Sequence, residues 1–404
     1  MAPTEQPPLL GFQREDFAYI PWGGILGEPY TLDSNLPALR TPREKADIHQ
    51  PPKYGLGNLD AMPLELLHSI LPQLDILSIT RFRRLNRQAR EIVDSVPQYK
   101  ALRTHTLHVL RSILLLGAGQ WHTCDTLYKT LCTPWCTDCG DFGDYLYIPS
   151  NSRVCLSCFT KAKKYLPLRH TDALRVFGLT HEALRSSARM MRSVAGTYTT
   201  NRYKRNERFL LVDAESGRAA GIQLHGSAEA MEQHVADVQA RKQQAYEERL
   251  AAAKKAASVP VTRRLRRPRA EEDVEAPEEY AESRVRAPRA EERYDHEETE
   301  PLRYMAVVRM PWLDRRSERV EKGFYCAACR NGYNGTKNWW RKFSVASFDE
   351  HLKVLGGIRD RVHHSDLRGF AGKDGQVIGD GESLYARYGS TMLALVAEAE
   401  KRGW

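Results

Sequence analysis

Four of the eight cysteines in this chain form two closely spaced pairs. Cys136 and Cys139 make the first C-x2-C pair, Cys155 and Cys158 make the second, and fifteen residues separate the two pairs. This spacing is typical of a zinc site with four thiolate ligands, because each tight turn directs two sulfurs toward one point. Four sulfurs fill the tetrahedral coordination of zinc, so we expect the metal to be structural.

The segment between the two pairs is expected to form a β-hairpin with its turn at "PSNSR". Cys132, four residues before Cys136, is an alternative ligand. Thioredoxin-like redox chemistry is a different interpretation, but it needs a strand, a loop and a helix around one pair. Cysteine catalysis needs a neighbouring base, and the sequence cannot place His122, His170 or His181 relative to these thiols. Zinc ligation is therefore the preferred interpretation.

A third cysteine pair, Cys326 and Cys329, precedes the helical pattern "SFDEHLKVLGG". His351 lies in the first turns of that helix and can join the two cysteines as a zinc ligand. His363 or His364, beyond the glycine pair, would complete the site. The alternative is a pair of ordinary thiols with surface histidines.

Length, composition and the amino-terminal residues limit the class of protein. With 404 residues and 42% hydrophobic content, the chain can bury a core and form two or three modules. It begins without a basic cluster and apolar run, and no stretch approaches ~18 uninterrupted apolar residues. We expect a protein of the cytoplasm, the nucleus or both, with no membrane partner. Disulfides are rare in those compartments, which favours metal ligation by the cysteines.

The net charge of +9 raises the alternative of a zinc-dependent nucleic-acid-binding regulator. The segment "GTYTTNRYKRNERF" interleaves basic and aromatic residues, as single-strand-binding surfaces do, although a solvated connector is the simpler interpretation. The run "RRLRRPR" from Arg263 is either a nuclear import signal or an ordinary charged stretch. Around it, residues 260–300 carry nine arginines against thirteen acidic residues, so this stretch is net acidic.

Composition divides the chain into segments. Residues 1–56 are rich in turn-forming Pro and Gly and predict an irregular amino-terminal arm. Residues 226–258, rich in Ala, Glu, Gln and Lys, predict one long exposed helix. Residues 259–302, with a repeated "PRAEE" and few apolar side chains, predict a disordered charged linker before a carboxyl-terminal module at 303–404. The segment "ERFLLVDAESGRAAGIQLHG" predicts two short strands around a turn.

Three short helices are predicted within 57–104. Pro63 suits the first turn of one helix and Pro72 ends it. Asp75 or Ser78 can start the second helix, and Asn86 can start the third. Near the other end of the chain, Ser347 can start the helix that carries His351. An apolar arc of roughly 160° covers the first helix, which is wider than so small a unit can bury. The arc comprises Leu64, Leu66, Leu67, Ile70, Leu71 and Leu74.

The stretch "MPLELLHSILPQLDILSITRFRRLNRQAREIV" resembles an F-box, the adaptor-binding motif of Skp-cullin-F-box ubiquitin ligases. Met62 and Ala89 depart from the common pattern, which has Leu and Trp there. The following "DSVPQYKALRTH", a helix and then cysteines make the chain similar to fungal F-box proteins. This resemblance implies that the adaptor contacts come from eight residues: Pro63, Leu66, Leu67, Ile70, Leu71, Leu74, Leu77 and Leu85.

The resemblance implies a non-catalytic substrate receptor, bound to a Skp-type adaptor and cullin complex and to an unknown protein substrate. The expected fold is a predominantly helical α+β protein. It has a three-helix F-box at 57–104, a helical segment with the four-cysteine site and short strands at 105–225, and further small zinc-stapled parts. A ligase with its own RING domain is disfavoured, because well over a hundred residues separate Cys158 from Cys326.

Overall fold

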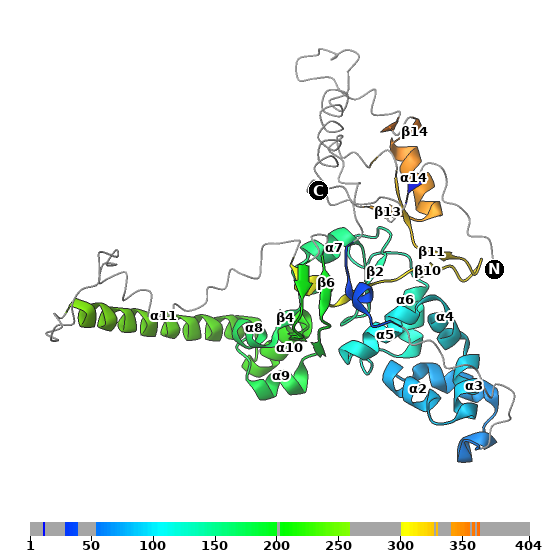
Figure 1. Ribbon diagram of the computed structural model, residues 1–404, viewed down its shortest axis with the longest axis horizontal. Coiled ribbons are helices and arrows are strands. Elements are labelled where there is room, and N and C mark those ends of the chain that lie inside the picture. Colours follow the sequence, from blue (N-terminus) through cyan, green and yellow to red (C-terminus); the bar gives the residue numbers. More distant parts are fainter. Residues whose placement is uncertain are drawn as a thin grey trace, which may run out of the picture. The chain divides into compact units, whose positions relative to one another are not determined.

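The computed structural model describes residues 11–12, 29–38, 54–199, 203–258, 300–326, 329, 341–355, 358–359 and 362–363 (Figure 1). These residues form two compact units. The larger unit spans Arg14–Gly323, and the smaller one combines Met1–Gln13 with Phe324–Trp404. The described part is predominantly helical with several small sheets, which confirms the expected α+β class. The expected linker at 259–302 lies almost wholly outside the described residues, so its disorder stays a prediction.

The three helices expected within 57–104 are present. A short 3-10 turn, Gly57–Ala61, leads into α1 (Leu64–Ile70), which Pro72 ends, and α2 (Ile76–Arg83) and α3 (Arg87–Ser95) follow. The Asp75 carboxylate accepts a hydrogen bond from the Ser78 N–H at 2.8 Å, and the Asn86 side chain accepts one from the Ala89 N–H at 2.8 Å. These two caps explain why the helices begin where the sequence predicted.

Three further helices pack against the first three: α4 (Pro97–His105), α5 (Leu107–Leu116) and α6 (Cys124–Leu131). α5 is strongly apolar, and Val109 and Ile113 on it are fully buried. It ends at Gly117, whose φ of +80° is the left-handed conformation that a glycine carboxyl-terminal cap adopts without strain. The F-box region is therefore continuous with the helices that lead to the cysteines.

The cysteine pairs flank the expected hairpin, formed by β2 (Tyr145–Tyr147) and β3 (Ser152–Val154). A third strand, β9 (Val307–Arg309), pairs antiparallel with β2, so that the sheet order is β3-β2-β9. β9 follows the long linker in sequence, yet it completes the sheet beside the first cysteine cluster. In the hairpin alone, one edge of β2 would have unpaired backbone groups. β9, more than 150 residues away in sequence, forms hydrogen bonds with that edge.

The carboxyl-terminal module was expected to begin at residue 303, but in the structure the larger unit extends to Gly323. The larger unit keeps α13 (Pro301–Tyr304), β9, β10 (Trp312–Leu313) and β11 (Val320–Glu321). The smaller unit has the sheet β1-β12-β13 from β1 (Gly11–Phe12), β12 (Phe324–Cys326) and β13 (Lys342–Phe343). Its other described elements are α14 (Val345–Leu355), β14 (Ile358–Arg359) and β15 (Val362–His363).

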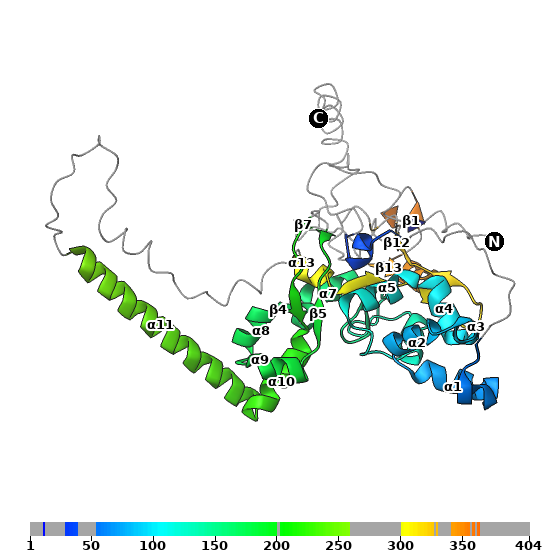
Figure 2. The ribbon, with the colours of Figure 1, turned by 60° about the horizontal axis from the view of Figure 1, so that its bottom comes forward.

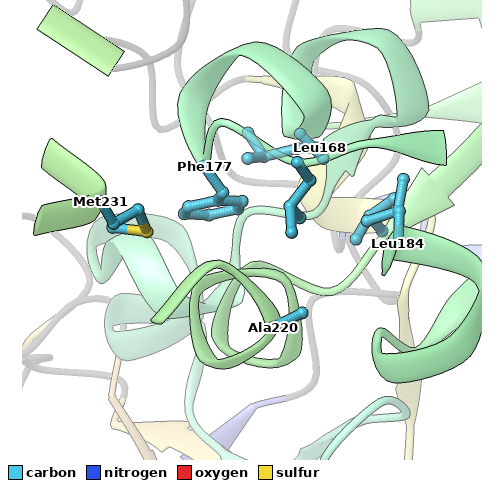
Figure 3. Close-up of a cluster of buried hydrophobic side chains, with 8 residues drawn as sticks. Leu168, Phe177, Leu184, Ala220 and Met231 are labelled. Carbon is cyan, nitrogen blue, oxygen red and sulfur yellow. The ribbon is translucent and has the colours of Figure 1, made fainter. Parts of the chain in front are cut away.

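The middle of the chain forms a helical layer on a small sheet of order β4-β8-β5. The strands are β4 (Leu168–Arg169), β5 (Met190–Arg192) and β8 (Leu210–Val212), and the helices are α8 (His170–Val176), α9 (His181–Ser187) and α10 (Ala214–His225). Figure 3 shows their shared core, in which the Phe177 ring lies between Met231 and Leu168, near Ala220 and Leu184.

The second strand expected in "ERFLLVDAESGRAAGIQLHG" is wrong, because "AESGRAAGIQLH" forms α10. Asp213 caps this helix through the Ser216 N–H at 2.9 Å. Gly217 and Gly221 lie on the buried side, and a Cβ at Gly217 would lie 2.8 Å from the Phe177 ring. The glycines thus serve close helix packing rather than a turn.

The long helix expected at 226–258 is confirmed as α11 (Ala228–Ser258). Met231 and Val235 in its first turns are buried, while most later side chains are exposed. Figure 2 shows one uninterrupted helix whose start lies beside α10. No described helix combines the length and the apolar character that crossing a membrane requires.

Candidate functional site

The structure brings the first two cysteine pairs together. The sulfurs of Cys136, Cys139, Cys155 and Cys158 all lie within 4.8 Å of one another, and those of Cys139 and Cys155 are 3.6 Å apart. Cys136 and Cys155 are buried and Cys139 is exposed. Four sulfurs converging on one point match the donor set of a closed tetrahedral zinc site.

Two different local structures position these sulfurs. The first pair lies on a tight turn, in which the Cys136 N–H donates to the Asp141 carbonyl at 2.6 Å and the Gly140 N–H to the Cys136 carbonyl at 3.0 Å. Gly140 has φ +75°, which other residues adopt only with strain. The second pair lies at the start of α7 (Leu156–Lys161), where Cys155 is the amino-terminal cap and Cys158 is in the first turn. A helix amino terminus favours negative charge on these sulfurs.

The thiols influence one another's ionisation. A hydrogen bond from the Cys155 thiol, helped by backbone N–H groups and opposed by burial, lowers the pKa of Cys136 to about 5. The same hydrogen bond and burial raise the pKa of Cys155, and burial raises the pKa of Cys158 to about 12. These shifts favour the thiolate at Cys136 and the protonated thiol at Cys155 and Cys158. A divalent cation favours the deprotonated form of every ligand, so metal binding releases protons here.

Cys132, the alternative ligand, is not part of the cluster that the structure assembles. Its carbonyl accepts a hydrogen bond from the Trp312 indole N–H at 3.2 Å, which joins α6 to β10. Cys124 is fully buried, and burial raises the pKa of its thiol to about 12. A thiol that stays protonated at neutral pH is a poor nucleophile, which agrees with the expectation that Cys124 is a buried residue and not a reactive one.

A buried arginine that the sequence did not single out holds the first cluster to the rest of the larger unit. Arg153, 2% exposed, donates to four backbone carbonyls, and burial lowers its pKa to about 9. The acceptors are Thr130 on α6, Gly143 after the first cysteine turn, and Met310 and Pro311 after β9. No spacing rule predicts such a residue, because its partners lie on three separate parts of the chain.

The second cluster comprises Cys326, Cys329 and His351. Their ligand atoms lie within 4.8 Å of one another, with 3.5 Å between the Cys329 sulfur and His351 Nε2, and all three residues are buried. Cys326 ends β12, and His351 lies on α14. Two sulfurs and one imidazole nitrogen also suit zinc. His363, the fourth expected ligand, contributes backbone to β15, but its side chain and His364 lie outside the described residues.

Aromatic side chains surround the second cluster. Phe324, Phe343 and Phe348 pack around it, and the His351 ring centroid is 4.3 Å from that of Phe343. The helix begins earlier than expected, because Ser344 and Ser347 hydrogen-bond reciprocally to each other's backbone N–H. Ser347 is therefore the inner member of the capping pair.

The apolar arc of α1 divides between core and surface. Leu67 and Leu71 are 5% and 4% exposed, so they pack into the core of the F-box region, and their contact with an adaptor stays a prediction. Leu74 and Leu77 are half-buried, and Pro63 is exposed. Five apolar side chains stay largely in solvent: Leu59, Leu64, Leu66, Ile70 and Leu85.

A charged cluster fixes the helices behind this surface. The Arg83 guanidinium donates two hydrogen bonds to the Asp94 carboxylate at 2.7 and 2.8 Å, and Arg103 adds a second ion pair at 2.9 Å. Burial raises the pKa of Asp94, but the two arginines outweigh this effect and lower it overall. The cluster joins α2, α3 and α4, so the exposed leucines sit on a preformed scaffold.

Residues 59–101 match the family model of the F-box domain. The chain therefore contains an F-box domain. The match covers α1, α2, α3 and the first part of α4, and it supports a role as the adaptor-binding component of a Skp-cullin-F-box ligase. No curated protein and no solved structure matches the chain.

Proposed function

We propose that this protein is a non-catalytic substrate receptor of a Skp-cullin-F-box ubiquitin ligase, acting in the cytoplasm, the nucleus or both. The F-box would bind a Skp-type adaptor, and other surfaces would bind the protein to be modified. Holding a target lysine near the ubiquitin-charged enzyme raises its effective concentration, so the receptor needs no catalytic group of its own.

One observation carries the adaptor assignment: a family-matched F-box leaves large apolar side chains in solvent. Leu66 and Ile70 are 50% and 47% exposed and lie four residues apart on α1, so they are neighbours on one helix face. Burying the exposed half of each contributes about 1 kcal/mol to binding. The adaptor would cover the part of the arc that this small helical unit cannot bury.

We propose that both clusters hold structural zinc. The support is the donor set of each cluster and the burial of its ligands, four thiolates in one and two thiolates with an imidazole in the other. Zinc would stabilise small units that bury little apolar surface. The nucleic-acid alternative has no comparable support, because the family match is to an F-box and not to a nucleic-acid-binding domain.

The adaptor assignment is tested by capture of a purified Skp-type adaptor on the immobilised full-length protein. Changing Leu66 and Ile70 together to Ser should weaken capture at least tenfold, because both remove apolar area from the interface. Leu224→Ser on α10 is the matched control, since Leu224 is 46% exposed but lies outside the F-box. If folded wild-type protein fails to retain an adaptor that an authentic F-box protein retains, the proposed function is wrong.

A further inference from the structure

A short amino-terminal segment, residues 29–38, crosses three elements of the larger unit, and we name it the strap. It includes one 3-10 turn, Leu32–Asn35, and contacts α5, β9 and β6 (Gly196–Tyr198), which pairs with β7 (Tyr203–Arg205). Thr31 and Leu32 are fully buried. In Figure 1 the strap, in blue, lies beside β6 and α5.

The strap binds the residue after β6 through one backbone bridge and β6 itself through a side-chain amide. The Tyr30 N–H donates to the Thr199 carbonyl at 3.2 Å, and the Thr199 N–H donates back at 3.0 Å. Further along, the Asn35 carboxamide donates to the Thr197 carbonyl and accepts from the Thr197 N–H, both at 2.7 Å. On the β6 side, these contacts involve only backbone groups of Thr197 and Thr199.

An acidic side chain gives the strap a second anchor. Asp33 is 8% exposed and accepts from Arg309 Nε at 2.8 Å and from the Arg309 N–H at 3.3 Å. The same guanidinium donates to the Ser34 hydroxyl at 3.1 Å. Charge-assisted hydrogen bonds of this kind specify a carboxylate at this position.

The groove is shaped for its occupant. A Cβ placed on Gly196 would lie 2.1 Å from Asn35 Oδ1, so only glycine leaves room for the carboxamide there. On the other side, the Arg111 guanidinium donates to the Pro37 carbonyl. The groove thus holds a short segment through one backbone bridge, one buried aliphatic side chain, one ion-paired acid and one amide, and the last three lie on a 3-10 turn.

We propose that this groove is a peptide-binding site that the strap occupies in cis. Its partner would be a protein segment of the same chemistry: an extended residue, then Thr or Ser, Leu, Asp, a small polar residue and Asn. A tethered occupant acts at an effective concentration on the order of millimolar. The strap therefore masks the groove until a tighter segment displaces it. The inference does not depend on adaptor binding.

The test uses the full-length protein and a fluorescent peptide of residues 29–38, followed by fluorescence anisotropy. Asn35→Ala removes two hydrogen bonds of the strap, and the triple change Leu32→Ala, Asp33→Ala and Asn35→Ala removes all three side-chain anchors. Peptide affinity should rise from wild type to Asn35→Ala and further in the triple variant, by at least about tenfold overall, because the competing occupant weakens.

Two controls define the site. A peptide carrying the three alanines should not bind, and adding Gly196→Val to the triple variant should abolish binding, because the valine fills the space of the Asn35 amide. Equal peptide binding by wild type and Asn35→Ala would overturn the proposal. So would loss of the folded circular dichroism spectrum in the triple variant, because the strap would then be part of the core. Adaptor capture, measured in parallel, should stay unchanged in each variant.

Discussion

The two candidate metal clusters use similar ligands in different settings. In the first cluster, four cysteines within 136–158 converge because a tight turn, a hairpin and a helix start are contiguous in sequence. In the second, the histidine of α14 meets Cys326 at the end of β12 and Cys329 beyond that strand, among packed phenylalanine rings. Local backbone geometry positions the first ligand set, whereas side-chain packing between a helix and a sheet positions the second.

The difference extends to what each metal would stabilise. The first cluster adjoins the sheet β3-β2-β9 and the buried Arg153, which together join residues from before and after the long linker. The second cluster belongs to the smaller unit. We therefore expect loss of the first metal to disturb much of the larger unit, and loss of the second to act only on the smaller one.

The largest effect is expected from changing Cys155 and Cys158 together to Ser. The protein should lose one equivalent of zinc, and β2, β3 and β9 should lose protection from hydrogen exchange, because metal affinity in such sites is folding energy. Atomic emission and hydrogen-exchange mass spectrometry measure the two results. Unchanged zinc content would show that the first cluster is not a metal site.

Arg153→Met is expected to lower the free energy of unfolding by about 3 kcal/mol, because it leaves four backbone carbonyls without their donor. Chemical denaturation at constant zinc measures the loss. Arg87→Met is the matched control, since Arg87 forms an exposed pair with Glu91 at 2.9 Å and should contribute less than about 1 kcal/mol. A similar loss in both variants would contradict the role given to Arg153.

Acid should weaken the hairpin of the first cluster through His122. Burial, with a further contribution from Arg189, lowers the pKa of His122 to about 4, although its Nε2 contacts the Ile148 carbonyl at 2.6 Å. The unfolded chain therefore binds a proton more readily, so stability is complete above pH 6.5 and falls as the pH drops toward 4. The loss from this group is about 3 kcal/mol.

His122→Gln, which can still donate to the Ile148 carbonyl, should flatten this part of the pH profile. Thermal or chemical unfolding at matched zinc content, between pH 7 and pH 4, measures the difference between the two proteins. Parallel profiles for wild type and variant would show that His122 is not the responsible group.

The smallest effect on the larger unit is expected from His351→Ala. The variant should lose only the second equivalent of zinc, and hydrogen exchange in α14 and β12 should increase while β2 and β3 stay protected. A loss of both metals, or exposure of β2 and β3, would show that the two clusters are coupled. The expectation that the second metal stabilises only the smaller unit would then be wrong.

Much of the first cluster and of the F-box followed from sequence alone. The spacing from Cys136 to Cys158 leaves little freedom in where the sulfurs can point, because short turns and a hairpin restrict the backbone. The helix starts at Asp75 and Asn86 could be predicted for a similar reason, because a capping side chain accepts a hydrogen bond from an N–H only three residues away. Interactions between residues that are close in sequence can therefore be predicted from the local sequence.

The tertiary structure alone decided which residues meet across long distances in the chain. It placed Leu67 and Leu71 inside and left Leu66 and Ile70 in solvent, paired β9 with β2, and joined Arg153 to Met310. It also seated the strap on β6, more than 160 residues away. Periodicity marks a residue as apolar or polar, but which neighbour covers it depends on how the whole chain packs.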